Sequence, residues 1–217
     1  MLNHLKVIAF MAMMIGILFG SAGRVDLPFV WATVAIYVIF MGTMLLRMDP
    51  DLLRERMQPG PGGKGRTQRK LMIPVVMGQW VVAGLDVGRY HWSDTVPASV
   101  QVAALAAFAL GLSLSGWAMS VNRFFSSVVR IQPERGHHVV TGGPYQFIRH
   151  PGYLGAVISS VGGTLAIGSW WAMGVTLVFL LLFLRRVLME DKFLHEQLAG
   201  YGEYAARVRY RLFPGIW

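Results

Sequence analysis

The sequence contains no cysteine. This absence excludes disulfide bridges, zinc sites built on thiolates, iron–sulfur clusters and a cysteine nucleophile. Charged residues are also scarce, at 14% of the 217 residues, whereas hydrophobic residues make up 54%. A soluble domain of this size carries more charge, so the composition indicates a membrane protein. Any catalysis must use histidine, tyrosine, arginine, carboxylates or a cofactor.

Acidic residues are few compared with basic ones, and the formal net charge is +9. The lysines and arginines fall in clusters between long apolar runs and do not follow an amphipathic face with interleaved aromatic residues. This distribution argues against nucleic-acid binding and indicates that the charges orient the chain in a bilayer.

Long apolar runs predict an all-α integral membrane protein with about six transmembrane helices, or five, because two of the runs are marginal in length. The runs cover residues 7–21, 27–46, 71–87, 98–121, 153–167 and 170–188. Only a short "GSW" stretch separates the last two runs. They are therefore predicted to form a tight helical hairpin that turns at Gly168 and Ser169.

The basic clusters lie on one side of this predicted topology. They follow the second, fourth and sixth spans, and only Arg24 and Arg89 remain for the loops on the other side. The positive-inside rule therefore places both termini in the cytosol. A retained first helix fits this arrangement better than a cleaved signal sequence.

The sequence divides into two parts. Residues 1–97 are predicted to hold the N-terminal membrane helices and a basic linker, 47–70, which is rich in Gly and Pro toward its end. Residues 57–70 of this linker are expected to be mobile and to lie near anionic lipid headgroups. Residues 98–217 are predicted to form a catalytic membrane core.

The stretch "GPYQFIRHPGYLG", residues 143–155, is unusual in an apolar chain. Its glycines and prolines brace the backbone. Pro151 suits the first turn of a helix and places Arg149 and His150 at its N-terminal entrance, where free amides favour an anionic group. Taken singly, each polar residue also fits a contact with lipid headgroups or a loop carbonyl.

A second polar cluster follows the last predicted span, in the C-terminal segment 190–217. Glu190 and Asp191 leave the membrane on the same side as Arg149 and His150, because the hairpin begins and ends there. Arg186 stands four residues before Glu190, on the same helical face. The residues from Phe193 onward predict an amphipathic cytosolic helix that lids a pocket.

Other polar residues carry weaker signals. His137 and His138 are adjacent in a loop, so their side chains diverge, and no acidic cluster completes a metal shell. The sequence therefore predicts no metal site. Asp86 lies near the end of a span, beside Arg89, which predicts an ion pair at the outer face.

The combination of "GGPYQFIRHPGYLG", an apolar hairpin, "ED" and "YGEY…RVRYRLFPGIW" resembles the isoprenylcysteine carboxyl methyltransferase family and its phospholipid N-methyltransferase relatives. The resemblance covers residues 117–217. It implies S-adenosylmethionine bound on the cytosolic face. The family positions that carry over are Tyr145, Arg149, His150, Tyr153, Gly155, Glu190 and, in place of a second glutamate, Asp191.

The resemblance also implies roles for these residues. Arg149 is expected to hold the carboxylate of the cofactor, and Glu190 its ribose or amino group. Tyr145 or Tyr153 is expected to face the adenine or the sulfonium. His150 is expected to orient the cofactor, or to act as a base if the methyl acceptor is an amine or a hydroxyl.

The expected partner is a lipophilic small molecule or a lipidated acceptor. The sequence does not determine which one, nor the oligomeric state. Two other functions fit the architecture. One is a nicotinamide-dependent membrane reductase of the sterol-reductase type, and the other is a non-catalytic membrane scaffold.

Overall fold

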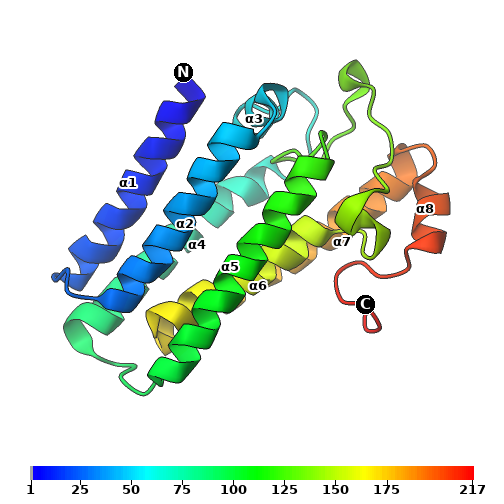
Figure 1. Ribbon diagram of the computed structural model, residues 1–217. Helices are drawn as coiled ribbons and strands as arrows, with labels where there is room; N and C mark the ends of the chain where they lie inside the picture. The colour runs from blue at the N-terminus through cyan, green and yellow to red at the C-terminus, as the bar shows by residue number, and fades with distance from the viewer. Residues whose placement is uncertain (1) are drawn as a thin grey trace.

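The computed structural model describes residues 2–217, except for the side chains of residues 2, 3 and 69. The described chain is a single bundle of helices without a β-strand (Figure 1). The longer helices are α1 (Leu2–Ala22), α2 (Pro28–Arg47), α4 (Arg66–Gly84), α5 (Ala98–Val121), α6 (Pro151–Ile167) and α7 (Trp170–Gln197). The shorter ones are α3 (Pro50–Met57), η1 (Leu85–Tyr90), η2 (Pro133–Arg135), η3 (Gly143–Gln146) and α8 (Tyr201–Arg207).

Within the described residues, five helices are long and apolar enough to cross a membrane. They cover His4–Ala22, Pro28–Arg47, Arg66–Tyr90, Ala98–Val121 and Trp170–Gln197. α6 is equally apolar but has only 17 residues. Large apolar side chains such as Leu46, Leu110 and Leu181 point outward from the bundle, as lipid-facing helices require. The prediction of an all-α membrane protein with five or six spans is confirmed.

Small residues bring α5 and α6 together. A Cβ atom on Gly155 would lie 2.5 Å from the carbonyl oxygen of Gly111 and 2.7 Å from the amide nitrogen of Ser115. Such contact between backbones is the usual way in which membrane helices pack through small residues. Gly155 therefore serves the packing of α6 against α5.

The α6–α7 hairpin is confirmed. Gly168 has a φ of +93°, which favours glycine, and the Ser169 hydroxyl accepts a hydrogen bond from the amide of Ala172 at 3.0 Å, which caps α7. α7 then continues well past residue 188, because no Gly or Pro lies between residue 188 and Gln197. The predicted amphipathic helix from residue 193 is therefore the end of α7. A separate short helix, α8, begins after Gly200, whose φ is +79°.

The predicted basic linker, residues 47–70, contains the short helix α3 and the start of α4. Asp49 caps α3 by accepting a hydrogen bond from the amide of Asp51 at 2.8 Å, and Pro50 occupies the first turn. Beyond α3, the backbones of Lys64 and Val129 exchange two hydrogen bonds, of 2.8 and 3.1 Å. The backbone of this segment is thus tied to residue 129 at one place, and its mobility stays a prediction.

At the end of the bundle that carries the hairpin turn, Asp86 is fully buried. One of its carboxylate oxygens accepts hydrogen bonds from the hydroxyls of Ser93 and Ser169, each at 2.5 Å. Arg89 instead donates to the carbonyl of Gly20 at 3.2 Å. The predicted ion pair is wrong, because the α6–α7 turn packs against Asp86 and supplies hydroxyl donors.

Candidate active site

The N-terminal end of α6 contacts the C-terminal segment of the chain. Pro151 is the first residue of α6, as predicted. The backbone amides of Arg149 and His150 donate to the carbonyls of Tyr210 (2.9 Å) and Arg211 (3.0 Å). Two segments about sixty residues apart are therefore held together at this end of the bundle, which we call the site end.

Asp191 is the centre of a buried hydrogen-bond network at the site end. Its side chain is 3% exposed. It accepts from Nε and Nη2 of Arg149 (2.9 and 3.2 Å), Nε2 of His150 (3.1 Å), the hydroxyl of Tyr201 (2.9 Å) and Nε of Arg211 (2.8 Å). This carboxylate joins α7 to α6, α8 and the C-terminal segment.

The guanidinium of Arg149 is occupied by the protein itself. Besides Asp191, it donates from Nη1 to the carbonyls of Val208 (2.9 Å) and Arg209 (2.7 Å). Burial opposes its charge, but the hydrogen bonds and the attraction of Asp191 outweigh that effect and raise the pKa of Arg149 above its ordinary value. Arg149 thus stays charged and organises the site end.

Glu190, the neighbour of Asp191, faces a different environment. Its carboxylate accepts a hydrogen bond from the hydroxyl of Tyr153 at 2.6 Å, and that hydroxyl in turn accepts one from Nε of Arg186 at 2.6 Å. Arg186 also donates to the carbonyl of Ser127 at 2.9 Å. Arg186 and Glu190 were predicted to share a helical face, and the Tyr153 hydroxyl lies between their polar groups.

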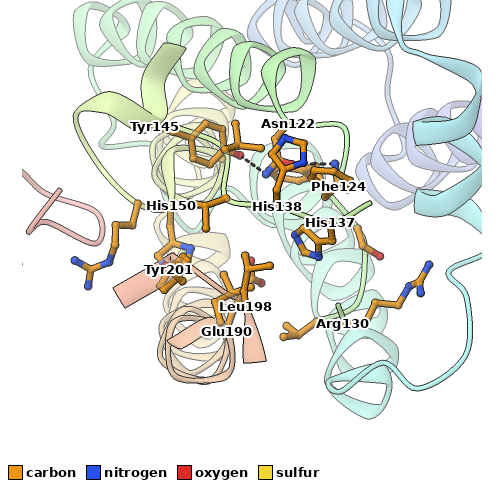
Figure 2. A pocket seen from close by; sticks show the side chains of 18 of the residues that line it. Asn122, Phe124, Arg130, His137, His138, Tyr145, His150, Glu190, Leu198 and Tyr201 are labelled. Carbon is orange, nitrogen blue, oxygen red and sulfur yellow. Dashed lines mark hydrogen bonds between the residues drawn. The ribbon is translucent and has the colours of Figure 1, made fainter. Parts of the chain in front are cut away.

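A pocket opens beside Glu190 and is lined by aromatic rings and histidines (Figure 2). The residues labelled there are Asn122, Phe124, Arg130, His137, His138, Tyr145, His150, Glu190, Leu198 and Tyr201. The ring centroids of Phe124 and His137 are 4.5 Å apart. Burial, aided by the positive charges nearby, lowers the pKa of His137 to about 4. At neutral pH this histidine is therefore an uncharged aromatic surface.

The structure brings most of the predicted site residues to this pocket. Those that line it are Tyr145, Arg149, His150, Tyr153 and Glu190. Asp191 lies behind Arg149 and His150 and supports them. Gly155 lies at the α5–α6 interface.

Several pocket residues were not singled out by the sequence. Phe124 gave no signal, because one aromatic residue after an apolar helix is common. His137 and His138 were considered only as metal ligands. Among the described residues, no group of three or more histidine and acidic side chains is arranged to hold a metal ion.

With this geometry in place, comparison with known proteins gives a consistent result. Residues 100–200 match the phospholipid methyltransferase family. They contain most of α5, the motif at residues 143–155, the hairpin and the Glu190–Asp191 pair. Residues 100–200 are therefore similar to the phospholipid methyltransferase family. The resemblance predicted from the sequence is confirmed.

Several individual relatives are also named as methyltransferases. A probable protein-S-isoprenylcysteine O-methyltransferase from Oryza sativa subsp. indica is 35% identical over 92 residues, which are 42% of this chain and 48% of the relative. The protein-S-isoprenylcysteine O-methyltransferase of Schizosaccharomyces pombe is 30% identical over 121 residues, 54% of this chain and 49% of the relative. The chain thus spans about half the length of these relatives.

A relative with a different name aligns over more of the chain. The nickel-cobalt-cadmium resistance protein NccN of Alcaligenes xylosoxydans xylosoxydans is 27% identical over 150 residues, 69% of this chain and 67% of the relative. The relatives of this chain thus carry names that refer to different roles.

Proposed function

We propose that this protein is an S-adenosylmethionine-dependent methyltransferase that acts at the membrane surface on a lipophilic acceptor. We propose further that the site end faces the cytosol, as the positive-inside rule predicts from the basic residues. The bound cofactor would supply the methyl group, and the side chains described above would hold and align it.

The position of Tyr153 carries this proposal. One side of this residue lines the pocket beside Glu190. It also lines an apolar groove of about 410 Å³ between α6 and α7. The groove is lined by Tyr153, Val157, Leu177, Leu180, Leu181, Phe183, Leu184, Val187, Leu212 and Phe213. A polar pocket and a lipid-facing groove that share one side chain suit a reaction between a soluble donor and an apolar acceptor.

The residues of the pocket fit this cofactor chemically. Glu190 uses one carboxylate oxygen for Tyr153, and its other oxygen makes no hydrogen bond to any described side chain. A half-buried carboxylate with a free oxygen attracts the amino group of the cofactor. The rings of Phe124 and the uncharged His137 offer flat surfaces for its base and its sulfonium.

The pocket is narrow, with a cavity of about 90 Å³. Ligand pockets usually measure roughly 300 to 1,000 Å³. Binding a nucleoside cofactor therefore requires the segments around the pocket to move apart. Leu198, Tyr201 and Tyr204 lie on the wall formed by the end of α7 and by α8, a short helix joined to α7 through Gly200. We propose that this wall moves.

His150 is the candidate base if the acceptor is an amine or a hydroxyl. A carboxylate such as Asp191 only accepts hydrogen bonds, so the contact of 3.1 Å places the proton of neutral His150 on Nε2. Nδ1 is then the nitrogen that accepts a proton. Transfer to a carboxylate or a thiolate needs no base, and the site then contributes alignment and exclusion of water.

Calorimetric titration of S-adenosylhomocysteine into the detergent-purified protein tests the proposal. We expect binding by the wild type and a loss of about tenfold or more in Glu190→Gln, because a charged hydrogen-bond partner is removed. Glu203→Gln is the matched control, since Glu203 lies exposed on α8. Reduced nicotinamide cofactor is titrated in parallel.

Each outcome is informative. Binding of the nicotinamide cofactor alone would replace the methyltransferase by a reductase. Absence of binding to folded protein would favour a scaffold. Equal affinities in Glu190→Gln and Glu203→Gln would show that Glu190 is not part of the cofactor site. Methyl transfer from labelled donor to membrane lipids and to prenylated thioethers would then identify the acceptor class.

A further inference from the structure

A buried ion pair joins α3 to the segment that follows α5. Nε of Arg130 donates to Oε1 of Glu55 at 2.9 Å, and Nη2 donates to Oε2 at 2.8 Å. Both side chains are 6% exposed. The Ser126 hydroxyl also donates to Oε1 of Glu55, at 2.6 Å. Glu55 therefore binds the segment 126–130 at two points.

The pair is fully ionised at neutral pH. Burial would raise the pKa of Glu55, but the hydrogen bonds from Arg130 and Ser126 prevail and leave that pKa below its ordinary value. Two parallel N–H···O bonds between a guanidinium and a carboxylate fix orientation as well as distance. This geometry compensates the cost of removing both charges from water.

The chain between α3 and α4 reinforces the contact. Gly63 lies so close to Val128 that a Cβ atom would come within 2.5 Å of its side chain. Gly60 approaches the guanidinium of Arg130 in the same way, at 2.8 Å. Together with the hydrogen bonds between Lys64 and Val129, these contacts leave the segment 126–130 little room to shift.

The same segment is a wall of the candidate cofactor pocket. Ser126, Val128, Val129 and Arg130 all line it. In Figure 2 the side chain of Arg130 runs away from the other labelled side chains, and its guanidinium is bound to Glu55. Arg130 thus contributes to the wall from behind, through its contact with α3.

We propose that Glu55 and Arg130 are positioning residues for the cofactor site. Through this pair the N-terminal part of the chain, outside residues 100–200, sets the shape of the pocket inside the methyltransferase segment. The inference rests on the proposed function, because it concerns how the same pocket binds S-adenosylmethionine. The pair acts by holding the segment 126–130, which forms a wall of the pocket, in place.

Calorimetric titration of S-adenosylhomocysteine into Glu55→Gln tests the proposal. The variant keeps the shape of residue 55 and removes its charge. We expect its dissociation constant to rise about tenfold, as removal of supporting contacts around a binding site commonly does. Glu134→Gln is the matched control, because Glu134 accepts from the same Arg130 nitrogen at 2.6 Å but is 54% exposed. We expect this control to bind like the wild type.

A second variant and a second measurement separate positioning from folding. Arg130→Lys keeps the charge but loses the paired geometry, so we expect an intermediate dissociation constant. Hydrogen–deuterium exchange of residues 126–130, measured without ligand, should rise in Glu55→Gln and stay unchanged in Glu134→Gln. If Glu55→Gln does not fold, Arg130→Lys supplies the affinity.

The outcomes distinguish the two proposals. If the wild type does not bind S-adenosylhomocysteine, the proposed function fails. Hydrogen–deuterium exchange of residues 126–130 then tests by itself whether Glu55 holds this wall in place. If the wild type binds and Glu55→Gln or Arg130→Lys binds equally well, the positioning role is overturned. Equal weakening in Glu55→Gln and Glu134→Gln would also overturn it, because the contact with α3 would then be irrelevant.

Discussion

A buried aspartate fastens each end of the α6–α7 hairpin, but the two have different neighbours. At the site end, Asp191 accepts from the guanidinium groups of Arg149 and Arg211 and from a histidine and a tyrosine. At the turn end, Asp86 accepts from two serine hydroxyls. Its second oxygen has no partner among the described residues.

The two aspartates therefore have different roles: Asp191 is the centre of a polar network, and Asp86 joins two neighbouring segments. Removing a carboxylate from water is costly, and nearby cations compensate that cost. The arginines at the site end do this, and they assemble His150, α8 and the C-terminal segment around one charge. At the turn end, within the part of the chain that the structure describes, the Asp86 side chain accepts only from neutral hydroxyl groups. The bond from Ser169 joins the α6–α7 turn to η1. The site end is therefore the better candidate for the proposed chemistry.

The largest predicted effect is at Asp191. Asp191→Asn leaves Arg149 buried with an uncompensated charge, so we expect the free energy of unfolding to fall by about 3 to 5 kcal/mol. Equilibrium unfolding in mixed detergent micelles measures this change. A loss below about 1 kcal/mol, the value of an ordinary hydrogen bond, would show that Asp191 is not the centre of the network.

A smaller effect is predicted for pH. Burial lowers the pKa of His137 from 6.5 to about 4. Between these values the unfolded chain binds more protons than the folded one, so stability falls as the pH drops from 6.5 toward 4. Melting temperatures measured across this range should show the decline, and His137→Gln should flatten it. An unchanged slope in the variant would mean that another group titrates.

A third prediction concerns the hydrogen bond from Arg211 to Asp191. Arg211 lies partly in solvent, with its side chain 34% exposed. We expect Arg211→Met to lower the free energy of unfolding by about 1 kcal/mol, the usual size of such a partly exposed contact. The same unfolding measurement tests this, and an effect as large as that of Asp191→Asn would contradict the ranking.

The smallest effect is predicted at the turn end. In Asp86→Asn the amide oxygen still accepts from Ser93 and Ser169, and the amide nitrogen replaces an oxygen that lacks a partner. We expect a change within about 1 kcal/mol. A loss comparable to that of Asp191→Asn would remove the contrast between the two ends and show that Asp86 carries an essential charge.

Much of the fold could be predicted because hydropathy and turn residues are local signals. The hairpin at Gly168 and the start of α6 at Pro151 follow from such signals and are present. The end of α7 could not be predicted, because an apolar helix can continue into water when its next residues are good helix formers. The environment of Asp86 was also out of reach, since Ser169 is more than eighty residues away.

The candidate site divides in the same way. The resemblance to the methyltransferase family predicted Tyr145, Arg149, His150, Tyr153 and Glu190 as site residues, and all five line the pocket. The partners of these residues are not visible in the sequence. Arg149 was expected to hold a ligand, and in the structure it binds Asp191 and two carbonyls. Glu55 was one acid in a basic stretch, and its partner Arg130 counted only as a positive charge.

The sequence by itself determined the membrane class, the hairpin, the position of the motif at its entrance and the resemblance to the methyltransferase family, because each depends on residue type and short spacing. Tertiary structure decided which carboxylate faces the pocket and which is buried behind it, and how α3 reaches the pocket wall. Adjacent residues on a helix point about 100° apart. Glu190 and Asp191 therefore acquire opposite surroundings only once α6, α8 and the C-terminal segment have packed around α7.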